Sequence, residues 1–107
     1  VEDGPFLGAS TTIGVVATDA PLDTAGATRL AQVAHDGIAL AIRPSHTPFD
    51  GDTLFALSLG AARQPPPNLA ALDVAAVAVV AEAIVRAVRA ARGLGGVPAA
   101  SELEWAR

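Results

Sequence analysis

The chain is 107 residues long, with 51% hydrophobic residues, 17% charged residues and a formal net charge of -4. It has seven cationic residues, all arginine, and this balance argues against nucleic-acid binding, which needs clustered positive charge. Cysteine is absent, which excludes both a disulfide framework and a thiolate metal site.

Several features predict a piece of a longer protein that works with a partner. The sequence starts with Val1 and contains no methionine. About half of the residues are hydrophobic, which is more apolar surface than a lone domain of this size normally buries, so we expect a partner to cover the remainder. Glu2 and Asp3 stand where a signal peptide would be basic, and we therefore expect a cytoplasmic protein.

The first half of the sequence predicts a strand followed by a helix. Residues 12–18 form a β-branched, apolar run that is typical of a strand. A turn over 19–23 comes next, and Asp23 or Thr24 can cap a helix over 24–42. Apolar residues recur along that helix at intervals of three and four, which predicts one buried stripe.

The second half predicts another strand and another helix. The strand is expected over 53–59, and the helix over 69–92 follows three prolines and a potential cap at Asn68. The most apolar stretch of this helix, 74–81, is far shorter than the ~20 residues that cross a membrane. We therefore expect a buried helix and no membrane partner.

Two strands are too few for a stable sheet, because their unpaired backbone groups would stay at open edges. The missing strands must therefore come from outside this chain. In the tail over 93–107, Trp105 is expected to anchor the chain against another subunit, since buried tryptophan is common at interfaces.

Thr11 stands directly after Ser10 and directly before the first predicted strand. Threonine in this place is typical of an amino-terminal nucleophile, although it also suits the start of any strand. The chemistry needs a cut between Ser10 and Thr11, because only then does Thr11 carry a free amine that can accept its hydroxyl proton near neutral pH. Residues 1–10 would then end one subunit and residues 11–107 would form the next.

Two carboxylates, Asp50 and Asp52, flank Gly51 directly before the second predicted strand. Close carboxylates do not ionise independently, so we expect the pair to titrate as a unit, although the same pattern also suits a tight turn. A calcium loop would need more oxygen ligands, and we expect no metal. His35 and His46 are expected to be structural, because the sequence lacks the elbow motif of a Ser-His-Asp triad.

The segments that carry this chemistry lie at 11–19, 34–37, 41–44 and 46–53. Together they resemble the carboxy-terminal part of the DmpA-like peptidase family, in register from about residue 10 to residue 60. That family includes aminopeptidases, β-peptidyl aminopeptidases and nylon-oligomer hydrolases. The resemblance implies an α/β protein with a layered α-β-β-α fold, made by a precursor that cuts itself into a larger α subunit and a smaller β subunit.

The resemblance also implies the site residues and partners. It makes Thr11 the nucleophile and Asp50 and Asp52 the accompanying pair, without a cofactor. Threonine with Asp-x-Asp is more similar to the nylon-oligomer hydrolases than to the DmpA-type aminopeptidases, which combine serine with Ser-x-Glu. It further implies that the α subunit completes the sheet and supplies oxyanion groups, that αβ units form a multimer, and that the substrate is a peptide or another amide.

Two alternative functions remain open at this point. Ornithine acetyltransferases use the same self-cleaving logic in a similar architecture, but pass the acyl group to an amine instead of water. An uncleaved homologue could instead serve only as a binding or assembly unit. The isolated chain is expected to be inactive in each case, because it lacks the α subunit.

Overall fold

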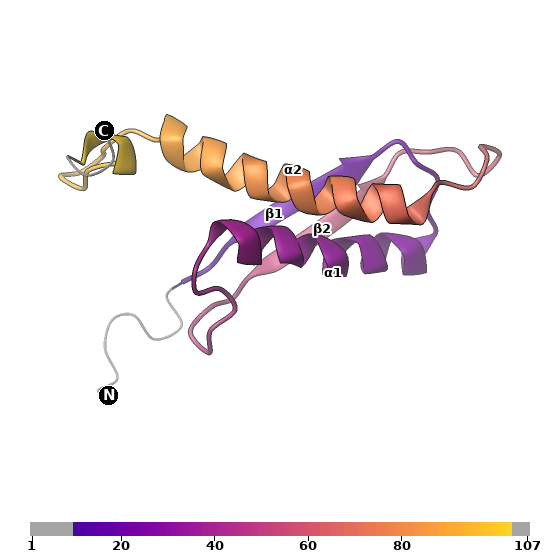
Figure 1. Cartoon of the computed structure of the whole chain (residues 1–107), viewed down its shortest axis with the longest axis horizontal. Helices are drawn as coiled ribbons and strands as arrows, with labels where there is room; N and C mark the ends of the chain where they lie inside the picture. Colours follow the sequence, from indigo (N-terminus) through magenta and orange to yellow (C-terminus); the bar gives the residue numbers. More distant parts are fainter. Residues whose placement is uncertain (1–9, 104–107) are drawn as a thin grey trace.

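The structure is a computed structural model that describes residues 10–103. The expectations for residues 1–9 and for Trp105 lie outside this range. The elements follow in the order β1 (Ile13–Thr18), α1 (Thr24–Ala41), β2 (Thr53–Ser58), α2 (Leu69–Ala90) and a short 3-10 helix, η1 (Ala100–Glu102) (Figure 1). These bounds lie close to those expected from the sequence, and the largest difference is that α2 ends at Ala90 instead of 92.

Both helices begin at side-chain caps. The Asp23 carboxylate accepts a hydrogen bond from the Gly26 N–H at 2.7 Å, and the Asn68 side chain accepts one from the Ala71 N–H at 3.1 Å. These bonds satisfy backbone donors that have no partner inside the first helical turn. Capping residues that were readable from the sequence therefore set the starts of α1 and α2.

β1 and β2 pair in parallel, with Ile13 opposite Thr53 and Thr18 opposite Ser58. The helix α1 forms the crossover between them, as parallel strands require. Beyond the strands proper, the ladder continues toward the start of β1 through a Thr53 N–H to Thr12 C=O bond of 2.9 Å and a bridge between Ser10 and Asp50. This extension fixes the region before β1 against the region before β2.

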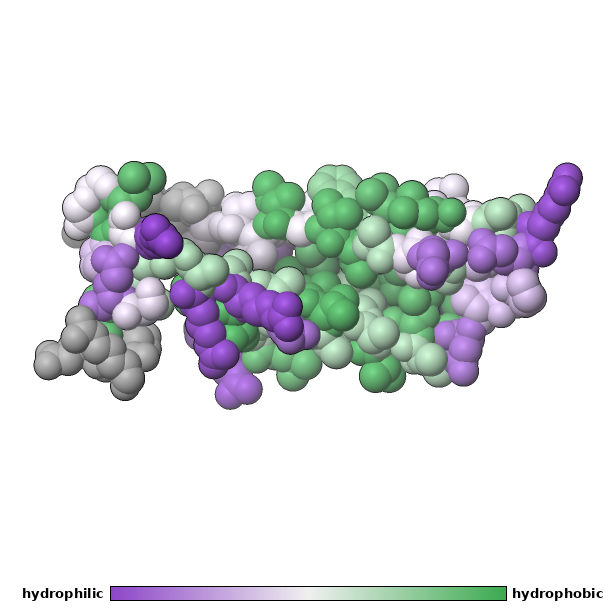
Figure 2. Space-filling view, turned by 90° about the horizontal axis from the view of Figure 1, so that it is seen from above, coloured by the Kyte–Doolittle hydropathy of each residue, from purple (hydrophilic) through white to green (hydrophobic). Residues whose placement is uncertain are grey.

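One face of the sheet is covered by the two helices, which lie side by side (Figure 1). Val16 from β1 packs there in a core with residues of α1 and α2, namely Leu30, Ala34, Ile38, Ala76 and Val80. The helices approach closely at Gly37, where a Cβ atom would lie 2.6 Å from the Val77 carbonyl oxygen. Seen from the α2 side, hydrophobic side chains also cover much of the middle of the surface (Figure 2).

The opposite face of the sheet is bare. Alternate residues of each strand point away from the helices, and the large ones remain exposed: Ile13 at 71%, Val15 at 60%, Phe55 at 56% and Leu57 at 52%. Within residues 10–103 the sheet has two strands only. None of the described helices is long and apolar enough to cross a membrane.

Candidate functional site

The predicted site residues meet at the amino ends of the two strands. Because the strands are parallel, the residues that precede β1 and those that precede β2 lie at the same end of the sheet. Ser10 is bridged to Asp50, and the Gly51 N–H donates a 2.8 Å hydrogen bond to the Ser10 carbonyl oxygen. The structure thus brings the Ser10–Thr11 peptide alongside the Asp-Gly-Asp segment.

Thr11 is exposed and its hydroxyl lies over Gly51. A Cβ atom added to Gly51 would come within 3.1 Å of Thr11 Oγ1, which is tighter than ordinary contact. Glycine at this position therefore leaves room for the hydroxyl beside the backbone of the loop. The Thr11 side chain follows the alternation of Ile13 and Val15, so it belongs to the bare face of the sheet.

Asp52 is the most enclosed ionisable side chain of the site, at 5% exposure. Its Oδ1 accepts a hydrogen bond of 3.0 Å from the Thr12 N–H, the amide that directly follows the predicted nucleophile. Its Oδ2 lies 2.7 Å from His46 Nδ1. The carboxylate therefore links the start of β1 to the loop between α1 and β2.

From the sequence we expect His46 to be structural. In the structure its side chain contacts the carboxylate of Asp52, a predicted site residue. Its backbone has a φ of 54°, in the left-handed region, and its Nε2 lies 3.3 Å from Nδ1 of His35 on α1. The two rings are tilted, with centroids 4.9 Å apart. The only sequence signal for this contact was that His46 shares the segment between α1 and β2 with both aspartates.

Asp50 uses different partners. Its Oδ2 accepts hydrogen bonds of 2.7 Å from both the N–H and the hydroxyl of Thr47, while its own N–H donates to the Thr47 carbonyl at 2.9 Å. Pro48 occupies the second position of this closed turn, where proline is favoured.

The hydroxyl of Thr47, then its backbone N–H and more weakly the nearby His46 lower the pKa of Asp50, against a small opposing effect of desolvation. Asp52 is not among these causes, and within residues 10–103 no hydrogen bond joins the two carboxylates. Asp50 and Asp52 thus have separate hydrogen-bond partners, and the expectation that they titrate as a unit stays a prediction.

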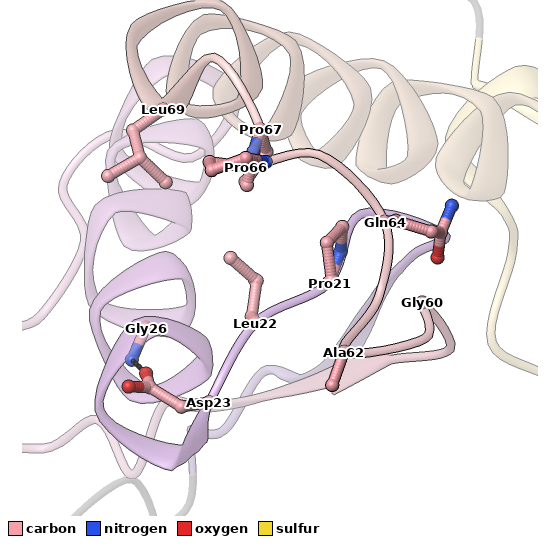
Figure 3. Close-up of a pocket in the computed structure, with 10 residues that line it drawn as sticks. All are labelled: Pro21, Leu22, Asp23, Gly26, Gly60, Ala62, Gln64, Pro66, Pro67 and Leu69. Atoms are coloured by element: carbon pink, nitrogen blue, oxygen red, sulfur yellow. Dashed lines mark hydrogen bonds between the residues drawn. The ribbon is translucent and has the colours of Figure 1, made fainter.

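A cavity of about 520 Å³ lies at the other end of the sheet (Figure 3). It is enclosed by the turn before α1 and by the proline-containing connector before α2. Its one ionisable side chain, Asp23, is the cap of α1. Within the described residues no group of three or more His, Asp or Glu side chains is arranged to hold a metal ion. The connected aspartate and histidine side chains therefore lie at the amino end of the sheet, away from this cavity.

Comparison with known proteins shows the family to which the chain belongs. The model of the family described as Peptidase family S58 matches residues 2–101, which confirms the resemblance to DmpA-like peptidases. An uncharacterized aminopeptidase of Mycobacterium tuberculosis is 43% identical over 101 residues, or 83% of this chain, and one of Mycobacterium leprae is 43% identical over 106 residues, or 88% of it. The chain spans 29% of the length of each of these relatives.

Proposed function

Because the chain belongs to peptidase family S58, we propose that it is the β-subunit region of an amide hydrolase whose nucleophile, Thr11, is released by self-cleavage of the Ser10–Thr11 bond. One observation carries this proposal. The Ser10 carbonyl accepts a hydrogen bond from the Gly51 N–H, and a Cβ atom on the same glycine would come within 3.1 Å of Thr11 Oγ1. The nucleophile and the target carbonyl thus lie beside the glycine that separates Asp50 from Asp52 in the sequence.

Self-cleavage proceeds in two steps, an acyl shift from nitrogen to oxygen and the hydrolysis of the resulting ester. The Thr11 hydroxyl oxygen attacks the Ser10 carbonyl carbon, the carbon–nitrogen bond breaks, and the hydroxyl proton passes to the nitrogen, which leaves an ester. Water then hydrolyses the ester to a Ser10 carboxylate and a free Thr11 with amine and hydroxyl. The Gly51 N–H, at 2.8 Å from the carbonyl oxygen, supports the first step, because a fixed donor stabilises the charge that develops there.

Turnover uses the same hydroxyl with its own amine as the base. The α-amine titrates near pH ~8, so its neutral form can take the hydroxyl proton as oxygen attacks a substrate amide. The proton passes to the leaving amine, and water releases the acyl group from Thr11. This scheme needs no cofactor.

The two aspartates contribute differently. Asp52 accepts the N–H of Thr12, so it fixes the peptide plane that directly follows the proposed nucleophile. Asp50 closes the turn from Thr47 and so holds the loop in which Asp52 sits. We therefore assign Asp52 to the reacting centre and Asp50 to support of the loop.

The rest of the precursor, as an α subunit, is proposed to cover the bare face of the sheet. The exposed Ile13, Val15, Phe55 and Leu57 form a continuous apolar face of the kind that packs against a second sheet in an α-β-β-α sandwich. An apolar groove of about 370 Å³ runs between β1 and α2, and offers room beside the unpaired edge of β1. The greater length of the relatives supports a longer precursor that could supply this subunit. We propose further that αβ units assemble into a multimer.

Intact-mass measurement of the full-length precursor, together with hydrolysis of a panel of aminoacyl anilides and amide oligomers, tests the proposal. The wild type and Thr11→Ser should appear as two pieces cut before residue 11 and should hydrolyse amides. Thr11→Ala should stay whole and inactive. Thr28→Ala is the matched control, since this exposed threonine bonds only within α1, to the Thr24 carbonyl at 2.8 Å.

Cleavage and turnover by Thr11→Ala would refute the assignment, as would an intact Ser10–Thr11 bond in a fully active wild type. An added amine acceptor separates the two reaction types. Hydrolysis yields only the free acid, whereas transfer of the acyl group to the amine would place the protein with the acetyltransferases. A precursor that stays whole and inactive in the wild type would leave an assembly role.

A further inference from the structure

The backbone N–H of Thr12 and the side chains of Asp52, His46 and His35 form one connected series at the amino end of the sheet. The Thr12 N–H bonds to Asp52, Asp52 lies 2.7 Å from His46 Nδ1, and His46 Nε2 lies 3.3 Å from His35. We propose that His46 is a positioning residue that holds the Asp52 carboxylate in its orientation toward the Thr12 N–H, the amide that directly follows Thr11. This inference rests on the proposed function, since it concerns the rate of that reaction.

The burial of Asp52 makes such a partner necessary. An ionised carboxylate can only accept hydrogen bonds, and at 5% exposure its oxygens have little access to water. Thr12 serves Oδ1 and His46 serves Oδ2. Without the imidazole, Oδ2 would lose its protein donor, and the carboxylate would be free to rotate toward solvent.

The hydrogen-bond geometry fixes which nitrogen of His46 carries a proton. Asp52 must accept, so Nδ1 of His46 is the donor. When His46 is neutral, its Nε2 accepts from Nδ1–H of His35, and when His46 is protonated, Nε2 donates to the same atom. Nδ1–H points at Asp52 in both charge states. His35 therefore holds the ring, and the bond to Asp52 does not require a charged imidazole.

The backbone at His46 directs its side chain to Asp52. The φ of 54° is a left-handed conformation, which asparagine, aspartate and histidine adopt more readily than other residues with a Cβ atom. The turn from Thr47 to Asp50 follows at once and is closed by hydrogen bonds in both directions. The left-handed conformation of His46, directly before this closed turn, thus brings its imidazole to Asp52 at the start of β2.

This geometry provides a matched set of variants. His46→Asn keeps the left-handed preference and places an N–H near the position of Nδ1, whereas His46→Gly keeps the backbone and removes the donor. In the full-length protein, we expect His46→Asn to retain kcat within about threefold of wild type. We expect His46→Gly to lower kcat by about 10- to 100-fold with KM within about twofold, the size expected for a lost bond to a charged group.

Measurements of the self-cleavage rate, kcat, KM and the thermal midpoint on these variants decide the matter. In the Asp52→Asn background, the further change to His46→Gly should cost less than about threefold, because the group it positions is already altered. Wild-type kcat in His46→Gly would overturn the inference. So would equal kcat losses in His46→Asn and His46→Gly, which would mean that a donor at this position is irrelevant.

If His46→Gly does not fold, His46→Gln replaces it, since its amide lies one bond farther out. Equal kcat for His46→Asn and His46→Gln at matched thermal midpoints would then overturn the inference. Thr11→Ala separates the two proposals. An active Thr11→Ala removes the proposed function, whereas an inactive Thr11→Ala together with a fully active His46→Gly removes only the role of His46.

Discussion

The two ends of the parallel sheet are closed by similar connections made with different chemistry. At the carboxyl end, the Ser58 hydroxyl donates to the Ala20 carbonyl at 2.7 Å and accepts from the Leu22 N–H at 2.9 Å. At the amino end, Asp52 accepts from the Thr12 N–H and contacts His46. At the carboxyl end, a side chain of β2 bonds to the segment that follows β1. At the amino end, the side chain just before β2 bonds to the residue just before β1.

This difference supports the proposal that the amino end of the sheet holds the functional site. Ser58 joins its loop with a neutral hydroxyl, which costs little to bury once it is hydrogen-bonded. Asp52 makes a comparable connection with a carboxylate, whose removal from water costs far more. Open parallel sheets usually bind ligands beyond the carboxyl ends of their strands. Here the connected Asp52, His46 and His35 side chains lie at the opposite end, next to the Thr12 N–H.

The contrast between the two ends would be wrong if substitutions of Asp52 and Ser58 had the same effect on kcat and on stability. In the full-length protein, Asp52→Asn keeps the shape and one acceptor but removes the charge, and we expect kcat to fall about 100-fold. Ser58→Ala leaves two backbone groups without their partner, and we expect about 1–3 kcal/mol of lost stability with kcat within about twofold. Kinetics and thermal unfolding on both variants measure this, and a slow Ser58→Ala would contradict it.

The two glycines at the ends of β2 sharpen the same contrast. A Cβ atom on Gly60 would lie 2.4 Å from the Asp19 carbonyl oxygen, so Gly60→Ala should destabilise the protein by about 3 kcal/mol. A Cβ atom on Gly51 would instead press on the Thr11 hydroxyl, so Gly51→Ala should lower kcat about tenfold with a nearly unchanged thermal midpoint. A Gly60→Ala variant with unchanged thermal stability and a lowered kcat would contradict the assignment of the functional site to the amino end.

The smallest expected effect concerns the turn that supports the amino end. Thr47 holds the pKa of Asp50 below its ordinary value of 3.8, so this carboxylate stabilises the fold above that pH and loses its contribution as the pH falls through the lowered pKa. Thr47→Val removes the hydroxyl donor but keeps the N–H. The pKa of Asp50 should rise toward 3.8, and acid unfolding should begin at higher pH, as a carboxyl titration followed by NMR would show. An unchanged pKa would contradict the assigned cause.

Local patterns in the sequence were enough to locate the helices and strands. Asp23 and Asn68 mark helix starts through hydrogen bonds that span three residues, and alternation along β1 and β2 marks the two faces of the sheet. Nothing local marked the end of α2, which was expected at residue 92 and lies at Ala90. Alanine and arginine continue the helical pattern there without a terminating residue, so the boundary depends on tertiary contacts.

The site was only partly predictable, because its contacts join residues far apart in the chain. The positions of Thr11, Asp50 and Asp52 before predicted strands suggested that they belong together, and the parallel pairing places them at one end. The bond from Thr12 to Asp52 spans forty positions and depends on that register. The contact of His46 depends on one left-handed residue in a loop, which no periodicity reveals.

If Thr11 is released by self-cleavage as proposed, the ladder bond between Gly51 and the Ser10 carbonyl has a consequence for the substrate that the enzyme would accept. Once the Ser10 segment has departed, the amide of Gly51 is an unpaired donor at the open end of a β-ladder. An incoming acyl group that reaches the Thr11 hydroxyl must fill that vacancy with its own carbonyl oxygen. The first residue of the substrate would therefore extend the β-ladder. The enzyme would recognise its backbone geometry more than its side chain.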